Sequence, residues 1–152
     1  MSIPTEALLA WIQEPILTKM LALWDEKRAG RDWPLRRDFD PLEFAFALGH
    51  ISLVEVHAPK RFFYRLDGTK QSELFGADCT GKYLDQVNTR AARDLTEQDL
   101  YAALASGRPE YHERDLDGVG GPRRCRGIVL PLSQDGRGID ILMTVVVADP
   151  MA

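Results

Sequence analysis

Apolar positions near the N-terminus recur at the spacing of an amphipathic helix. The helical pattern runs from Thr5 to Arg28, but Pro15 lacks an amide hydrogen and therefore predicts two pieces instead of one helix. Gly30 offers a stop to the second piece. The apolar face of that piece is formed by Ile16, Leu17, Met20, Leu21, Leu23 and Trp24.

Two ways of covering this apolar face stay open at the level of the sequence. The helix can pack on the rest of its own chain, or it can pack on a second copy of the protein. In the second case we expect Met20, Leu21 and Trp24 to form a homodimer interface, since such a stripe is hard to leave in water.

Capping residues predict a further short helix after an extended linker. Asp40 can cap the helix, Pro41 suits its first position, and Glu43 stands three residues after the cap. This helix is expected to reach about Ala47.

The remaining pattern predicts a five-stranded sheet with a helical block in the middle of the sequence. Lys70–Phe75 and Arg90–Ser106 are the predicted helices of this block. Segments rich in β-branched and aromatic residues, or bounded by turn residues, are the predicted strands His50–His57, Arg61–Leu66, Glu110–Leu116, Arg123–Leu132 and Ile139–Ala148.

The last strand is the most apolar, so we place it in the middle of one antiparallel sheet, between the first and the fourth strand. The polar second and third strands then lie at the edges, which gives the strand order 2-1-5-4-3. The predicted class is α+β with helices on one face of the sheet. Residues 1–30 are expected to form an N-terminal helical extension, and residues 31–152 the main domain.

Alternation along the second strand assigns its side chains to two faces. Phe62, Tyr64 and Leu66 should share the face toward the core, and Phe63 and Arg65 should share the other. A core tyrosine with satisfied hydrogen bonds and a ligand contact are both open for Tyr64. Arg65 can form a surface ion pair, or it can bind a carboxylate or phosphate next to Gly68 and Thr69.

Several segments of the sequence resemble the small bacterial PAS-like family, in which one PAS-type domain of about this length is often the whole protein. The resemblance extends from about Leu21 to Val147. It lies in Trp24, DFDP (38–41), LGHISLVEV (48–56), FFYRLDGT (62–69) and FGADCTGKYLD (75–85).

This resemblance implies a cupped domain with a small-molecule cavity between the sheet and the helices Lys70–Phe75 and Arg90–Ser106. We expect a sensory or regulatory module that signals through a partner protein. The alternative is a homodimeric interaction or scaffold protein that binds no ligand. The cofactor is unknown, because no haem or flavin motif is present. The candidate ligand-binding residues are His50, Phe62, Tyr64, Arg65 and Thr69.

The composition of the chain argues against several other classes of function. A net charge of -4 argues against binding to nucleic acid. No basic leader and no stretch of about 18 apolar residues is present, so we expect a cytoplasmic protein without a membrane span. The two cysteines, Cys79 and Cys125, are expected to be reduced thiols.

The residues do not predict an enzyme. His50, His57 and His112 are the only histidines, and their spacing favours neither a metal site nor a catalytic set. We expect His112 and Glu113 to be solvated, because their strand is polar. The arginines around Cys125 (RRCR, 123–126) favour a solvated face over an anion site.

Overall fold

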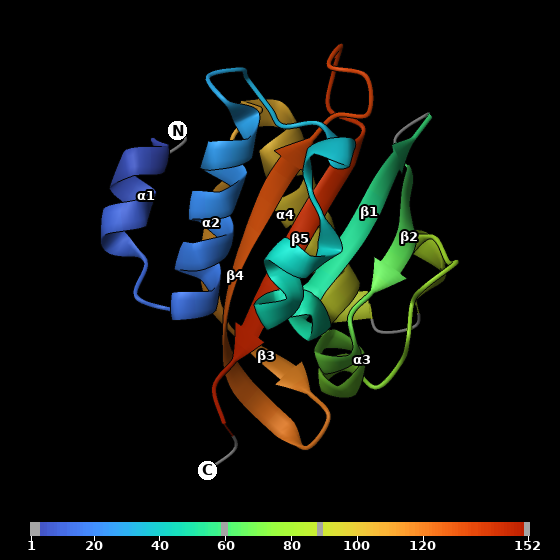
Figure 1. The fold of residues 1–152 in the computed structure, drawn as a ribbon. Helices are drawn as coiled ribbons and strands as arrows, with labels where there is room; N and C mark the ends of the chain where they lie inside the picture. Colours follow the sequence, from blue (N-terminus) through green and yellow to red (C-terminus); the bar gives the residue numbers. More distant parts are fainter. Residues whose placement is uncertain (1–3, 59–60, 88–89, 151–152) are drawn as a thin grey trace.

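The computed structural model describes residues 4–58, 61–87 and 90–150 (Figure 1). The helices are α1 (Thr5–Trp11), α2 (Pro15–Arg28), α3 (Thr69–Phe75) and α4 (Arg90–Ser106), with 3-10 turns η1 (Arg36–Asp38), η2 (Pro41–His50) and η3 (Leu84–Gln86). The strands are β1 (Ile51–His57), β2 (Arg61–Asp67), β3 (Glu110–Gly118), β4 (Gly121–Leu132) and β5 (Ile141–Ala148).

The helix ends follow the residues that predicted them. Pro15 is the first residue of α2, and the Glu14 carboxylate accepts a hydrogen bond from the Ile16 amide at 3.0 Å. At η2, the Glu43 carboxylate accepts the Asp40 amide at 3.0 Å, and the Asp40 carboxylate accepts the Leu42 amide at 3.0 Å. The predicted short helix therefore exists, although it is a 3-10 helix and extends beyond Ala47 to His50.

The sheet has five antiparallel strands in the order β2-β1-β5-β4-β3, which confirms the predicted order. The apolar strand β5 lies at its centre, and β2 and β3 lie at its edges. The polar residues of β3 are tolerated because an edge strand has one side open to water.

Helices cover both faces of this sheet. On one face, α1, α2 and η2 close over a cluster that includes Ile51, Leu53, Ile128, Met143 and Val145. On the other face, α4 packs through Leu100 and Ala103 on Val54, Val129 and Leu142. In Figure 1, α4 is seen behind β4 and β5. The predicted helical block thus has one face to itself, and the N-terminal extension occupies the opposite one.

The apolar stripe of α2 is buried within its own chain. Met20, Leu21 and Trp24 are 0%, 0% and 2% exposed, and the Trp24 indole donates a hydrogen bond to the Pro131 carbonyl at 2.8 Å. This packing is the first of the two alternatives left open by the sequence. Contact between these side chains and a second copy would require α2 to leave its own sheet.

The second strand departs from simple alternation at Arg65. Leu66 pairs with Leu53 and Tyr64 pairs with Val54, so Arg65 is the extra residue of a β-bulge. As a result, Tyr64 lies on the α4 face while Leu66 packs in the cluster on the α2 face. The prediction that Leu66 shares a face with Phe62 and Tyr64 is wrong, because alternation cannot register an inserted residue.

Candidate functional site

A cavity of about 140 Å³ lies between the sheet and the helices α3 and α4. Residues of β2, β3, β4 and β5 form its floor, and residues 77–87, which follow α3, form one wall. Its lining residues are Tyr64, Asp67, Gln71, Phe75, Ala77, Cys79, Lys82, Leu84, Gln86, Val87, Arg93, Leu95, Thr96, Asp99, Leu100, His112, Arg114, Leu116, Val129, Thr144 and Val146.

Asp67 connects the wall of the cavity to the sheet through hydrogen bonds. Its carboxylate accepts the Ser52 hydroxyl at 2.7 Å and the Cys79 amide at 3.0 Å. Its own amide donates to the Thr80 hydroxyl at 3.0 Å. The DGT and DCTG sequences therefore hold the cavity wall in place.

Gly68 adds a steric requirement at the same corner. A Cβ at this position would lie 2.3 Å from the Gly49 carbonyl oxygen, which is closer than two such atoms can approach. Any larger residue would displace the start of α3. FFYRLDGT and FGADCTGKYLD, two of the segments that resemble the PAS-like family, thus contain residues that support the wall of the cavity.

Three charged or titratable side chains meet at the other side of the cavity. The Arg114 guanidinium contacts the Asp99 carboxylate at 2.5 Å, and the His112 Nε2 atom lies 3.4 Å from the other oxygen of Asp99. Asp99 belongs to α4, whereas His112 and Arg114 are alternate residues of β3 and so share one face. The cluster joins the edge strand to the helix above it.

Burial sets the protonation of this cluster. It lowers the pKa of His112 to about 4, with a further lowering by the Arg114 charge, so the imidazole is neutral at pH 7. Burial raises the pKa of Asp99, and Arg114 opposes that shift. The His112 Nδ1 atom is buried and has no hydrogen-bond partner in the described part of the chain.

Two hydroxyl groups also face the cavity. Tyr64 of β2 is buried, which raises the pKa of its phenol, and Thr144 lines the same cavity from β5. Among residues 4–58, 61–87 and 90–150, neither hydroxyl has a hydrogen-bond partner. These two groups are available to a molecule in the cavity.

The structure places the five predicted ligand-binding residues in different surroundings. Tyr64 lines the cavity, and Phe62 is buried next to it, with its ring centre 5.1 Å from that of Tyr101. His50 Nδ1 lies 3.1 Å from the Val146 carbonyl oxygen, behind the lining. Arg65 is exposed and forms an ion pair with Glu55 at 3.0 Å, while Thr69 is exposed at the start of α3.

Sequence reasoning missed Asp99 and Arg114, and it expected His112 to be solvated. The prediction for His112 is wrong, because its ring lies between β4 and α4. A signal was present, since alternation puts His112, Arg114 and the apolar Leu116 on one face of β3. The partner on α4 could not be identified without the tertiary fold.

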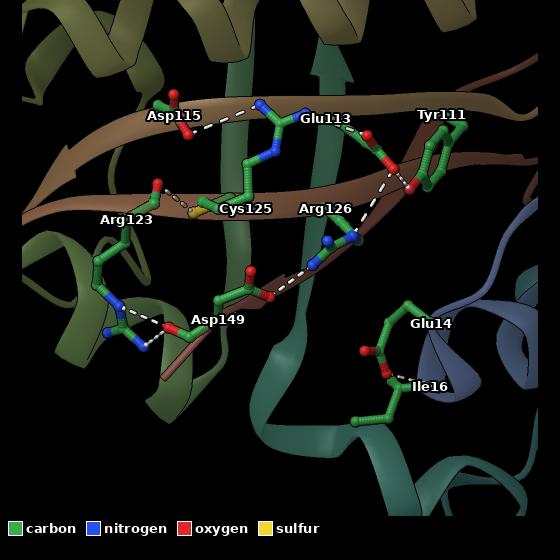
Figure 2. A network of polar contacts seen from close by, with 10 residues as sticks. Glu14, Ile16, Tyr111, Glu113, Asp115, Arg123, Cys125, Arg126 and Asp149 are labelled. Atoms are coloured by element: carbon green, nitrogen blue, oxygen red, sulfur yellow. Dashed lines mark hydrogen bonds and ion pairs between the residues drawn. The ribbon is translucent and has the colours of Figure 1, made fainter. Parts of the chain in front are cut away.

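The opposite face of β3 and β4 carries a separate network at the surface (Figure 2). Glu113 accepts hydrogen bonds from Tyr111 at 2.6 Å and from Arg124 at 3.1 Å, and Arg126 pairs with Asp149 at 2.5 Å. These contacts confirm that Arg124 and Arg126 share a solvated face. Their charges are balanced by neighbours on the same surface.

The described residues show neither a metal-binding cluster nor a membrane-spanning helix. Over the described ranges, no cluster of histidine, cysteine, aspartate and glutamate has the arrangement of a metal site. No helix within the same ranges combines the length and the apolar character needed to cross a bilayer.

Comparisons with known proteins agree with this architecture. A family model described as a PAS domain matches residues 12–141. The structure is similar to the PAS domain of BvgS from Bordetella pertussis, with a TM-score of 0.55 and 18% identity over 74% of this chain and 89% of that one. It is also similar to a sensory box sensor histidine kinase from Vibrio cholerae, with a TM-score of 0.51 and 13% identity over 72% and 92% of the two chains. No curated protein sequence matches the chain.

Proposed function

Because the chain belongs to the PAS domain family, we propose that it is a sensory module that binds a small molecule in the cavity between α4 and the sheet. PAS domains are typically sensory or regulatory parts of signalling proteins and are generally not enzymes. The single observation that carries the proposal is the cavity itself. It has an apolar interior with the free hydroxyls of Tyr64 and Thr144.

Signalling to a partner protein is supported by the attachment of the cavity wall to the edge of the sheet. The Tyr83 hydroxyl lies 2.8 Å from His57 Nδ1, and the Asp85 carboxylate forms two hydrogen bonds with Arg61. The residue between them, Leu84, lines the cavity. A ligand that displaces this wall would change the surface at β1 and β2, where a partner can detect it.

A blocking variant tests the proposal. We expect small molecules from a metabolite panel to raise the melting temperature of the wild-type chain and to be retained in native mass spectrometry. Thr144→Met fills the cavity and should abolish both effects. Thr69→Met is the matched control, because Thr69 is exposed and does not line the cavity. Protection that persists in Thr144→Met, or a panel without any ligand, would contradict the proposal.

An interaction module without a ligand is the second candidate. The observation in its favour is the surface of η2, where Leu42, Phe46 and Leu48 are exposed apolar side chains. Light scattering of the purified chain separates the candidates, since this function requires self-association or a stable partner complex while the cavity stays empty. A monomer that binds a small molecule would exclude it.

A further inference from the structure

We propose that the cavity takes a compact organic anion, namely a carboxylate on an apolar body about the size of a benzene ring. This inference rests on the proposed function, and it adds the chemical class of the ligand. Three properties of the cavity carry it: its size, its apolar interior and the charges that remain unbalanced at one rim.

The size of the cavity limits the body of the ligand. Its volume is about 140 Å³. A protein cavity of roughly 150 Å³ lined by apolar side chains holds a benzene molecule. The lining is apolar at Leu100, Val129 and Val146, and the first two share a buried cluster with Tyr64. One aromatic ring or a short branched chain therefore fills the enclosed part, and a larger cofactor does not fit.

Among the described residues, the charged groups that line the cavity are three cations and two carboxylates. Lys82, Arg93 and Arg114 are the cations, and Asp67 and Asp99 are the carboxylates. Both carboxylates already have protein partners, since Asp67 accepts two hydrogen bonds and Asp99 is paired with Arg114. The neutral His112 adds no charge to the interior. One or more cations are thus left for the ligand.

In the described part of the chain, the two cations without an ion pair meet the same segment: Lys82 belongs to the wall, and Arg93 of α4 donates to backbone carbonyls of that wall. Within the described residues, neither Lys82 nor Arg93 forms an ion pair. Hydrogen bonds from Thr80 to the Asp78 carboxylate lower the pKa of Asp78, and the charge of Lys82 lowers it further. Arg93 donates to the carbonyls of Asp85 and Val87 at 3.3 and 3.4 Å, and its charge adds to the lowering of the pKa of Asp85 by Arg61. The Asp85 carboxylate is held by Arg61. Lys82 lies at the start of residues 82–87, and Arg93 contacts the end of this segment at Val87. An anionic group at this rim can therefore bind both side chains while the apolar body of the ligand enters the cavity.

Isothermal titration calorimetry of the full chain with three probes of similar shape tests the ligand class. The probes are benzoate, benzamide and benzylamine, which carry a negative, a neutral and a positive head. We expect benzoate to bind at least about tenfold more tightly than benzamide, and benzylamine not to bind. The double variant Lys82→Gln and Arg93→Gln should weaken benzoate at least about tenfold and leave benzamide within about twofold.

A control with the same change in net charge removes long-range effects. Arg65→Gln with Lys70→Gln neutralises two exposed cations that do not line the cavity, and benzoate affinity should stay within about twofold. Equal affinity for benzamide and benzoate, or benzoate affinity unchanged in the Lys82 and Arg93 variant, would overturn the inference.

The same measurements distinguish failure of this inference from failure of the proposed function. If benzoate does not bind but a neutral or cationic compound of the panel does, and Thr144→Met abolishes that binding, the anion assignment is wrong and the sensory function stands. If no compound binds at all, both are wrong.

Discussion

The two faces of the sheet are made by alternate residues of the same strands, but their coverings differ. On the α2 face, Ile141, Met143 and Val145 of β5 meet a continuous apolar layer from α1, α2 and η2. On the α4 face, Thr144 and Val146 of the same strand line a cavity. The difference lies in the covering elements, because α4 brings Asp99 and Arg93 to its face whereas α2 brings Met20, Leu21 and Trp24.

This comparison indicates that the two faces of the sheet contribute unequally to the stability of the domain. The α2 face is packed closely and should supply most of the stability of the sheet, since buried apolar area is the main favourable contribution to folding. The α4 face leaves polar groups without partners in the described part of the chain and should contribute less. Substitutions on the two faces are therefore expected to have unequal effects.

The largest effect is expected on the α2 face. Trp24→Ala should lower the free energy of unfolding by about 4 kcal/mol, because it leaves a large void and removes the hydrogen-bond donor of the Pro131 carbonyl. Urea denaturation followed by circular dichroism measures the change. Trp11→Ala is the matched control, with an expected loss of at most about 1 kcal/mol, since Trp11 is 58% exposed and makes an edge contact with Tyr111. Equal losses at the two tryptophans would contradict the assignment of stability to this face.

An intermediate and pH-dependent effect is expected at His112 on the α4 face. The pKa of His112 is about 4 in the folded chain and about 6.5 when unfolded, so the unfolded state binds the proton first. Stability should therefore fall as the pH decreases from about 6.5 to about 4.

Replacement of the imidazole isolates this contribution from that of its neighbours Asp99 and Arg114. His112→Gln should make the loss of stability between pH 6.5 and 4 smaller than in the wild type by roughly 2 kcal/mol. Urea midpoints measured across this pH range provide the comparison. Parallel pH profiles of the two proteins would show that His112 is not held neutral by its burial.

The smallest effects separate two buried hydroxyls on the α4 side. Ser52→Ala should cost about 1 to 2 kcal/mol, because the Ser52 hydroxyl donates to Asp67 at 2.7 Å. Thr144→Val should change stability by less than about 0.5 kcal/mol, because its hydroxyl faces the cavity and has no partner among the described residues. Thermal denaturation resolves this difference. A larger loss for Thr144→Val than for Ser52→Ala would mean that the cavity face depends on a polar contact of Thr144.

The elements and their order could be predicted from the sequence because their signals are local. The apolar run of β5 identified the central strand, and Asp40, Pro41 and Glu43 identified the start of η2. The cluster of charged and titratable side chains at the cavity could not be predicted in the same way. Asp99, His112 and Arg114 come from α4 and β3, and their contact depends on how that helix crosses the sheet.

The face assigned to Leu66 shows a second limit of sequence reasoning. Alternation is a strictly local rule, and a single unpaired residue at Arg65 reverses it for the remainder of the strand. No residue type in the sequence FFYRLD (62–67) indicates which residue is the extra one. The bulge is set by pairing with β1, where Leu53 and Val54 are consecutive but their partners are not.

The cross-strand pair of His112 and Gly127 has a consequence for how this sequence can vary. The two residues are directly paired, and a Cβ on Gly127 would lie 2.3 Å from Cε1 of the imidazole. The combined size of the two side chains is therefore limited. Among descendants of this protein, a larger residue at 127 is expected only together with a smaller one at 112, so the two positions should covary as a reciprocal pair.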